Sequence, residues 1–237
     1  MPTTDSLSLE TPDGSMPAYE ALPDGDAKGG VIVVQEAFGL TSHIESICRR
    51  LADAGYRAVA PALFHRSGSP VFEYGEYEKL MPVMKDLTAD GIRADLAATA
   101  AHLAGAGLEG RRVGIVGFCM GGTVALVAGA EAPLGAAVTF YGGGVSQGRF
   151  GYAPLVEVAP GLRTPWLGLF GDLDQGIPVD DVEALRAAAA KAPVETEVVR
   201  YPDAGHGFNC DDRDAYHEPS ATDAWARTLA WFEQHLA

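Results

Sequence analysis

The segment from Val113 to Leu126 constrains the fold of this chain more than any other stretch. It begins with the apolar, β-rich run 113–116, passes through Gly117-Phe118-Cys119-Met120-Gly121, and continues with small residues that favour a helix. A glycine two residues before and another two residues after the central residue are typical of a tight strand-to-helix turn, in which the strand and helix backbones approach closely. The sequence therefore predicts a strand, a sharp turn with Cys119 at its apex, and a helix.

Cys119 occupies the position that carries the nucleophile in turns of the G-x-Nuc-x-G kind. The free N–H groups and the dipole at a helix N-terminus stabilise a thiolate and a developing oxyanion. This motif alone leaves a second interpretation open, in which the cysteine is only a small packed residue. A catalytic Cys119 requires a base and an acid elsewhere in the chain.

Strand and helix patterns alternate on both sides of this turn. The β-branched run 31–34 is typical of a strand buried on both faces. We expect a hairpin over 6–22, a loop over 61–78, further strands at 56–60, 135–141, 166–170 and 195–201, and helices at 76–88, 90–104 and 180–191. Such alternation predicts one α/β domain over 1–237, with a mostly parallel central sheet and helices on both faces.

Two further helices are predicted in more detail. Ser42-His43-Ile44-Glu45 has the spacing of a capping box, Gly55 marks the stop, and Cys48 lies on the apolar stripe between them as a core residue. The last helix is expected to bury one face that carries Trp225, Leu229, Phe232 and Leu236.

The charge of the chain restricts its partners. A formal net charge of −15 argues against nucleic acid and anionic membranes, because both require basic surfaces. No apolar run approaches the ~18 residues that span a bilayer, and the first residues lack the pattern of a signal peptide. We therefore expect a cytoplasmic protein, a monomer or homodimer, that acts on a small molecule.

The three cysteines, at positions 48, 119 and 210, form neither a disulfide framework nor a metal-binding spacing. No other cluster in the sequence has the spacing of metal ligands. We expect no metal and no cofactor.

Three loops at the carboxyl ends of predicted strands carry the candidate catalytic residues. Cys119 is followed by an aspartate, at 172 or 174, and then by His206, which lies between two glycines. A histidine is needed to take the thiol proton, and an acid is needed to fix the tautomer of that histidine. We favour Asp174, which lies further into its loop, and expect Asp172 to bind backbone in the turn. Nucleophile, acid and histidine follow the chain order of the α/β-hydrolase triad.

Two backbone amides are the candidate oxyanion hole, those of Met120 and Ala37. Glu36 ends the strand 31–34 abruptly, at the edge where open α/β sheets place their chemistry. Phe38, Phe64, Tyr77 and Tyr141 are candidates to line a substrate pocket. The alternative for the aromatic residues of 61–78 is a surface loop with a few packed rings.

Several segments together resemble the dienelactone hydrolase family of α/β-hydrolases. They are Val33-Val34-Gln35-Glu36-Ala37-Phe38-Gly39, Gly117-Phe118-Cys119-Met120-Gly121-Gly122, Gly171-x-x-Asp174-x-x-x-Pro178, Gly205-His206-Gly207-Phe208 and the C-terminal run 224–232. The resemblance covers nearly the whole chain. It implies a triad of Cys119, Asp174 and His206, with Glu36 hydrogen-bonded to the resting thiol until a substrate arrives.

The chain departs from that family at the residues that bind the substrate carboxylate. The resemblance places two arginines there, one four residues after the histidine and one four residues before a tyrosine of the covering segment. Here these positions hold Cys210 and, if the tyrosine is Tyr77, Glu73. Without an arginine fork a carboxylate has little to hold it. A neutral lactone or small ester is therefore expected, unless His65, Arg66 or Arg149 supplies a positive contact.

The sequence thus predicts a hydrolase of lactones or small carboxylic esters that acts through an acyl-cysteine. Two alternatives remain open. One is a ligand-binding protein without catalysis on the same fold, and the other is a redox-sensing protein in which Cys210 is the resolving thiol for Cys119.

Overall fold

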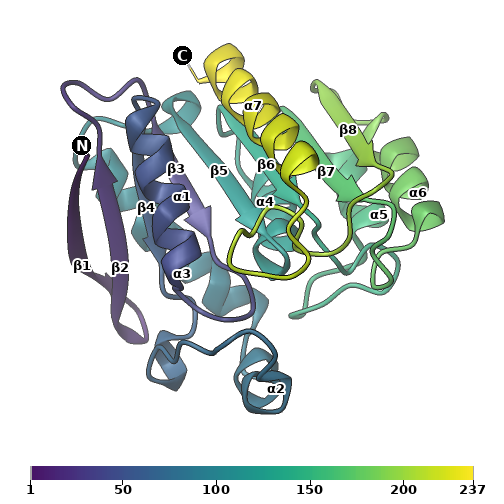
Figure 1. Cartoon of the computed structure of the whole chain (residues 1–237). Helices are drawn as coiled ribbons and strands as arrows, with labels where there is room; N and C mark the ends of the chain where they lie inside the picture. Colours follow the sequence, from purple (N-terminus) through teal and green to yellow (C-terminus); the bar gives the residue numbers. More distant parts are fainter. Residues whose placement is uncertain (1, 237) are drawn as a thin grey trace.

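The structure is a computed structural model that describes residues 2–236, and its centre is an eight-stranded sheet (Figure 1). The strand order is β1-β2-β4-β3-β5-β6-β7-β8, in which the β1–β2 and β2–β4 pairs are antiparallel and all others parallel. The prediction of a mostly parallel sheet is confirmed. The strands are β1 (Thr3–Thr11), β2 (Gly14–Leu22), β3 (Gly30–Val34), β4 (Arg57–Pro61), β5 (Val113–Phe118), β6 (Ala136–Phe140), β7 (Trp166–Gly171) and β8 (Thr196–Tyr201).

Helices cover both faces of the sheet, as predicted. Helices α1 (Ser42–Asp53) and α7 (Glu218–His235) lie in front of the sheet in Figure 1, and α3 (Ala89–Ala104), α4 (Met120–Glu131) and α6 (Val179–Ala189) pack on the other face. Every residue of β3, β5, β6 and β7 is buried as a result. The shorter helices are α2 (Tyr77–Lys85) and α5 (Leu155–Val158). Within residues 2–236, no helix combines the length and apolar character of a membrane span.

Helix α1 begins at Ser42, as predicted, but not through a capping box. Thr41 is the N-cap and makes no side-chain cap hydrogen bond, so Ser42 stands one position too far into the helix to cap it. The Ser42 hydroxyl instead donates to Asp212 Oδ2 (3.2 Å), and Glu45 pairs with an arginine one turn further along. The predicted capping box is therefore wrong. Cys48 is fully buried, as predicted.

The buried face of α7 is rotated from the predicted stripe. Trp225 and Leu229 are only half-buried, and the Trp225 ring lies 3.9 Å from the guanidinium carbon of Arg50 on α1. Phe232 is fully buried, as predicted, whereas the other buried positions near it, at 224, 228 and 231, each lie one residue before a predicted one. The buried residues of α7 are Ser220, Ala221, Ala224, Thr228, Trp231 and Phe232.

The strand register brings the carboxyl ends of the central strands to one level. Val34 lies opposite Gly117, and Phe118 lies opposite Phe140. The loops that follow β3, β5 and β6 therefore begin side by side. The segment 61–76 and helix α2 lie beyond this edge, below the sheet in Figure 1.

Candidate active site

Cys119 is held at the apex of a strained turn between β5 and α4. Its backbone has φ 54° and ψ −113°, a left-handed conformation that a residue with a side chain rarely adopts. The flanking glycines are required sterically. A Cβ at Gly117 would lie 1.8 Å from the Gly121 carbonyl oxygen, and one at Gly121 would lie 2.3 Å from the Val34 oxygen. The turn therefore fixes the thiol above the sheet edge.

The structure joins His206 to Asp174 rather than to Asp172. The Nδ1 atom of His206 lies 2.6 Å from Asp174 Oδ2, and the other oxygen of this buried carboxylate accepts a hydrogen bond from the Gly176 N–H (2.8 Å). Asp172 instead forms a two-pronged ion pair with Arg200, at 2.7 and 2.6 Å. The predicted backbone role of Asp172 is replaced by this ion pair.

The electrostatics of the site favour a thiolate and an imidazolium. Burial opposes ionisation of Cys119, but the interactions of the thiolate with His206 and, less strongly, Arg149 outweigh it, so the pKa of the thiol is lowered. Burial likewise opposes the charge of His206, and the negative Cys119 together with Asp174 raises the pKa of that imidazole to about 10. The two groups thus stabilise each other as an ion pair.

Glu36 is fully buried and faces an arginine rather than the thiol. Its Oε1 atom accepts a hydrogen bond from the Tyr141 hydroxyl (3.4 Å) and lies 3.6 Å from Arg213 Nη1. No hydrogen bond joins Glu36 to Cys119 in residues 2–236, and its negative charge raises the pKa of the Cys119 thiol. The expected contact between Glu36 and the resting thiol is absent from this arrangement.

Arg213 is a site residue that the sequence did not reveal. Its guanidinium carbon lies 5.5 Å from the centre of the Phe38 ring and 5.4 Å from that of Tyr74, close enough for cation–π attraction. The sequence feature that could have identified it is weak: Arg213 is the one basic residue in the acidic run Asp211-Asp212-Arg213-Asp214.

The four predicted aromatic lining residues occupy different places. Tyr141 is buried beside the triad, with its ring centre 5.1 Å from that of His206. Phe38 is also buried, and the largely exposed Tyr77 lies 6.0 Å from it at the rim. Phe64 packs against Phe72 instead, and no described contact joins it to the triad.

The two predicted oxyanion donors have free N–H groups. Met120 is the first residue of α4, where the amides have no partner inside the helix. Neither the Met120 nor the Ala37 N–H donates to another backbone group within residues 2–236. The Cys119 N–H, by contrast, is bound to the Phe140 carbonyl (3.1 Å).

Of the three residues predicted as possible positive contacts for a substrate, His65 and Arg66 are bound elsewhere. His65 and Arg66 both bind the buried carboxylate of Asp95, at 3.0 and 2.8 Å. Arg149 lies on the loop that follows β6, and its charge helps to lower the pKa of Cys119.

Cys210 is buried, and its sulfur lies 3.2 Å from the Tyr74 hydroxyl. Burial raises the pKa of the Cys210 thiol to about 12.

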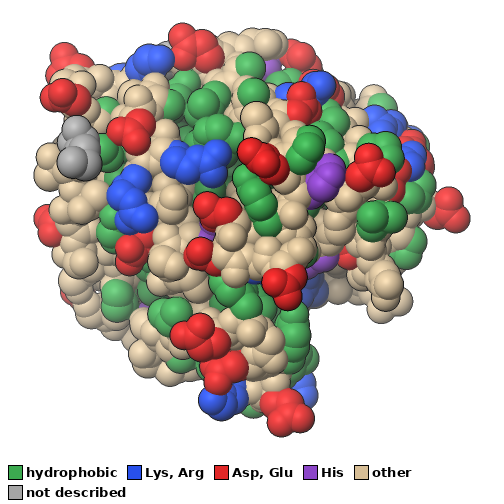
Figure 2. Space-filling view, viewed as in Figure 1, with side chains coloured by type: hydrophobic (Ala, Val, Ile, Leu, Met, Phe, Trp, Pro, Cys, Tyr) green, Lys and Arg blue, Asp and Glu red, His purple; other side chains and the backbone are tan. Residues whose placement is uncertain are grey.

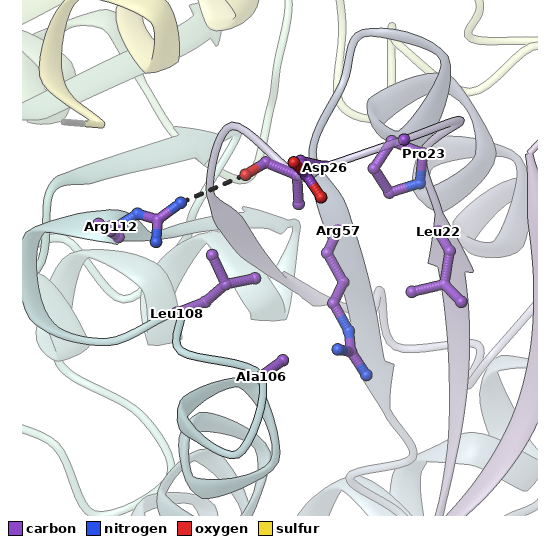
Figure 3. A pocket seen from close by; sticks show the side chains of 9 residues that line it. Leu22, Pro23, Asp26, Arg57, Ala106, Leu108 and Arg112 are labelled. Atoms are coloured by element: carbon purple, nitrogen blue, oxygen red, sulfur yellow. Dashed lines mark hydrogen bonds between the residues drawn. The ribbon is translucent and has the colours of Figure 1, made fainter.

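Two clefts adjoin arginines at this end of the sheet, one of about 480 Å³ beside Arg149 and one of about 350 Å³ beside Arg213. A larger cavity of about 530 Å³ lies at the opposite end of the strands (Figure 3). Its two arginines are already engaged: Arg57 binds Glu20 (2.7 Å), and Arg112 binds the Ala27 carbonyl (3.3 Å). Both guanidinium groups of this cavity therefore already have hydrogen-bond partners within the chain. Acidic side chains are spread across the face shown in Figure 2, in keeping with the net charge of −15.

Comparison with known proteins gives consistent results. The pattern of the dienelactone hydrolase family matches residues 16–236. A provisionally named carboxymethylenebutenolidase of Salmonella typhimurium is 42% identical over 234 residues, which cover 96% of this chain and 86% of that protein. A carboxymethylenebutenolidase of Rhodococcus opacus is 27% identical over 225 residues, covering 93% and 87%.

A crystal structure of a provisionally assigned dienelactone hydrolase from Klebsiella pneumoniae matches with a TM-score of 0.90. It is 41% identical and covers 99% of both chains. The family match spans most of the chain, and the mostly parallel sheet with helices on both faces agrees with the α/β-hydrolase fold of that family. The chain therefore belongs to the dienelactone hydrolase family.

Proposed function

We propose that this chain hydrolyses lactones or small carboxylic esters with Cys119 as nucleophile, His206 as base and acid, and Asp174 as the residue that orients His206. The observation that carries the proposal is the contact of 2.6 Å between His206 Nδ1 and Asp174, behind a thiol whose pKa His206 lowers. The names of the relatives support the same class of substrate.

The reaction has two halves. The Cys119 sulfur forms a bond to the substrate carbonyl carbon, and the oxyanion is stabilised by the Met120 and Ala37 amides, each worth ~3 kcal/mol. The C–O bond then breaks, and His206 gives its proton to the leaving alkoxide. Water attacks the thioester while His206 takes its proton, and cleavage of the C–S bond releases the acid and restores the thiolate.

The part of the substrate that faces Glu36 carries no negative charge in this proposal. Arg213 is the cation on that side, and it already faces the Glu36 carboxylate at 3.6 Å. The positions expected from the family resemblance to supply the arginine fork hold Cys210 and, if Tyr77 is the matching tyrosine, Glu73. Phe38 and the rim residue Tyr77 suit an uncharged lactone or ester there better than a carboxylate.

The proposal is tested with Cys119→Ala. Hydrolysis of 4-nitrophenyl acetate should fall to the background rate, while Cys48→Ala, which removes a buried thiol far from the triad, keeps its activity. Urea unfolding of both variants controls for loss of fold. Wild-type rates in Cys119→Ala would refute the role of the thiol.

The two alternatives are disfavoured by particular observations. A protein that only binds ligands has no need of the strained Cys119 turn or of the His206–Asp174 contact. A resolving thiol should ionise easily, whereas the pKa of Cys210 is raised to about 12. A Cys119–Cys210 disulfide after mild peroxide treatment would favour the redox function.

A further inference from the structure

The loop after β6 holds Arg149 in a defined position at the carboxyl end of the central strands. Gly143 and Gly144 provide the space for its side chain, because a Cβ at either position would lie 2.9 Å from an Arg149 side-chain atom. The guanidinium also lies 4.5 Å from the Phe150 ring, and Phe150 has a left-handed backbone with φ 57°. Such strain persists only where the surrounding structure enforces it. The loop thus specifies where the guanidinium lies.

Arg149 differs from the neighbouring arginines at this edge because its charge is not neutralised. Arg200 is paired with Asp172, and Arg213 faces Glu36. Within residues 2–236, the Arg149 guanidinium forms no ion pair and no hydrogen bond. A half-buried guanidinium with its five donors free is well suited to bind an anion, and most specifically a carboxylate.

A cleft of about 480 Å³ adjoins Arg149, and one of its walls begins at the residue that follows Asp174. Its walls are the loop 144–149 and the loop 175–178, which follows Asp174 directly. The cleft is polar, with Gln147 and Gln175 among its lining residues. Its one carboxylate, Asp181, accepts a hydrogen bond from Ser146 (3.1 Å). The charge of Arg149 is also felt at the thiol, where it lowers the pKa of Cys119.

We propose that Arg149 determines specificity by binding an anionic oxygen group of the substrate, best a carboxylate, in the cleft between the loops 144–149 and 175–178. This inference rests on the proposed ester or lactone hydrolysis and deepens it. The substrate is uncharged where it faces Glu36 and anionic where it faces Arg149, on the other side of the nucleophile.

The test compares two pairs of esters that differ mainly in charge. Mono-4-nitrophenyl glutarate against 4-nitrophenyl pentanoate places a carboxylate on the acyl side. Acetoxybenzoate against acetoxybenzamide, both 4-substituted, places it on the leaving-group side. The value of kcat/KM is measured for the wild type, Arg149→Gln and Arg149→Lys. Arg111→Gln serves as the control, because it removes the same charge from an exposed residue between α3 and β5.

The wild type should favour the carboxylate in at least one pair. In Arg149→Gln, kcat/KM for that carboxylate should fall about 10- to 100-fold, the usual effect of one charged hydrogen-bonding partner. The loss for the neutral ester should be at least about 10-fold smaller, so the preference for the carboxylate falls, and urea unfolding shows that the variant is folded. Arg149→Lys should recover part of the loss, and Arg111→Gln should match the wild type.

The failure of this inference differs from the failure of the proposed function. Cys119-dependent hydrolysis with no carboxylate preference in either pair, or equal losses for the charged and neutral esters in Arg149→Gln, overturns the inference alone. A protein that hydrolyses no member of either pair refutes the proposed function and this inference with it.

Discussion

Replacing Asp174 by asparagine should nearly abolish hydrolysis, because the side-chain amide of the asparagine can be held in only one orientation. The Gly176 N–H donates to Asp174 Oδ1 (2.8 Å), so the asparagine oxygen must stay on that side. Its NH₂ group then faces His206 Nδ1, where the carboxylate now lies at 2.6 Å. An NH₂ donor at this place favours the tautomer with the proton on Nε2, which cannot take a proton from the thiol.

The expected loss follows from these contacts. Losing a hydrogen bond to a charged group costs about 1.5–3 kcal/mol, or roughly 10- to 150-fold in rate. The wrong tautomer costs about 10⁴-fold in kcat in a serine triad. We therefore expect kcat of Asp174→Asn for 4-nitrophenyl acetate to fall between about 10²- and 10⁴-fold, measured from pH 6 to 9 with urea unfolding as the stability control.

The matched control is Asp172→Asn. Asp172 and Arg200 are partly exposed, so their ion pair should contribute little to stability and nothing to the chemical step. Its kcat should stay within about threefold of the wild type. Wild-type kcat in Asp174→Asn, or an equal loss in Asp172→Asn, would refute the role of Asp174 in orienting His206.

Three further predictions concern the thiol, the turn and the buried carboxylate. The rate of iodoacetamide alkylation of Cys119 should rise with pH through an inflection below 9.0. The neighbouring imidazolium lowers the thiol pKa, so the reactive thiolate is lost only as the pH falls through that lowered value. An inflection above 9.0 would contradict this. Gly117→Ala should lower the free energy of unfolding in urea by more than ~4 kcal/mol, whereas Gly161→Ala, whose Cβ meets nothing within 4 Å, should be nearly neutral. Arg213→Gln should lower the free energy of unfolding by about 3 kcal/mol, because it leaves the Glu36 charge buried and unpaired. The double variant Arg213→Gln/Glu36→Gln should recover most of this loss. Additive losses from the two substitutions would contradict the pairing.

Much of the fold follows from local patterns. The run 31–34 and the segment 113–118 are apolar without alternation, which indicates strands buried on both faces, and both are central strands. Helix ends and helix faces were less predictable. Whether Ser42 or Thr41 caps α1 depends on one residue of register, and Ser42 is drawn to Asp212 on a distant loop. Local propensity carries no information on that contact.

In the candidate site, too, some residues could be predicted from local sequence and others could not. Cys119 and His206 stand out because each lies between glycines after a strand, a setting that core residues rarely share. Arg213 was missed because its loop folds back, bringing the guanidinium beside Gly207 in space although it lies six residues away in the chain. Phe64 was misplaced because aromatic composition indicates burial but not direction. Such long-range and directional information enters only with the tertiary structure.

The most direct test of the central claim is to identify the residue that carries the acyl group. Rapidly quenched 4-nitrophenyl ester reactions are examined by intact-protein and peptide mass spectrometry. We predict one acyl group on the peptide that contains Cys119, removed by neutral hydroxylamine as a thioester is, and absent from Cys119→Ala. Sustained turnover with the acyl group on another residue would contradict the assignment of Cys119 as nucleophile.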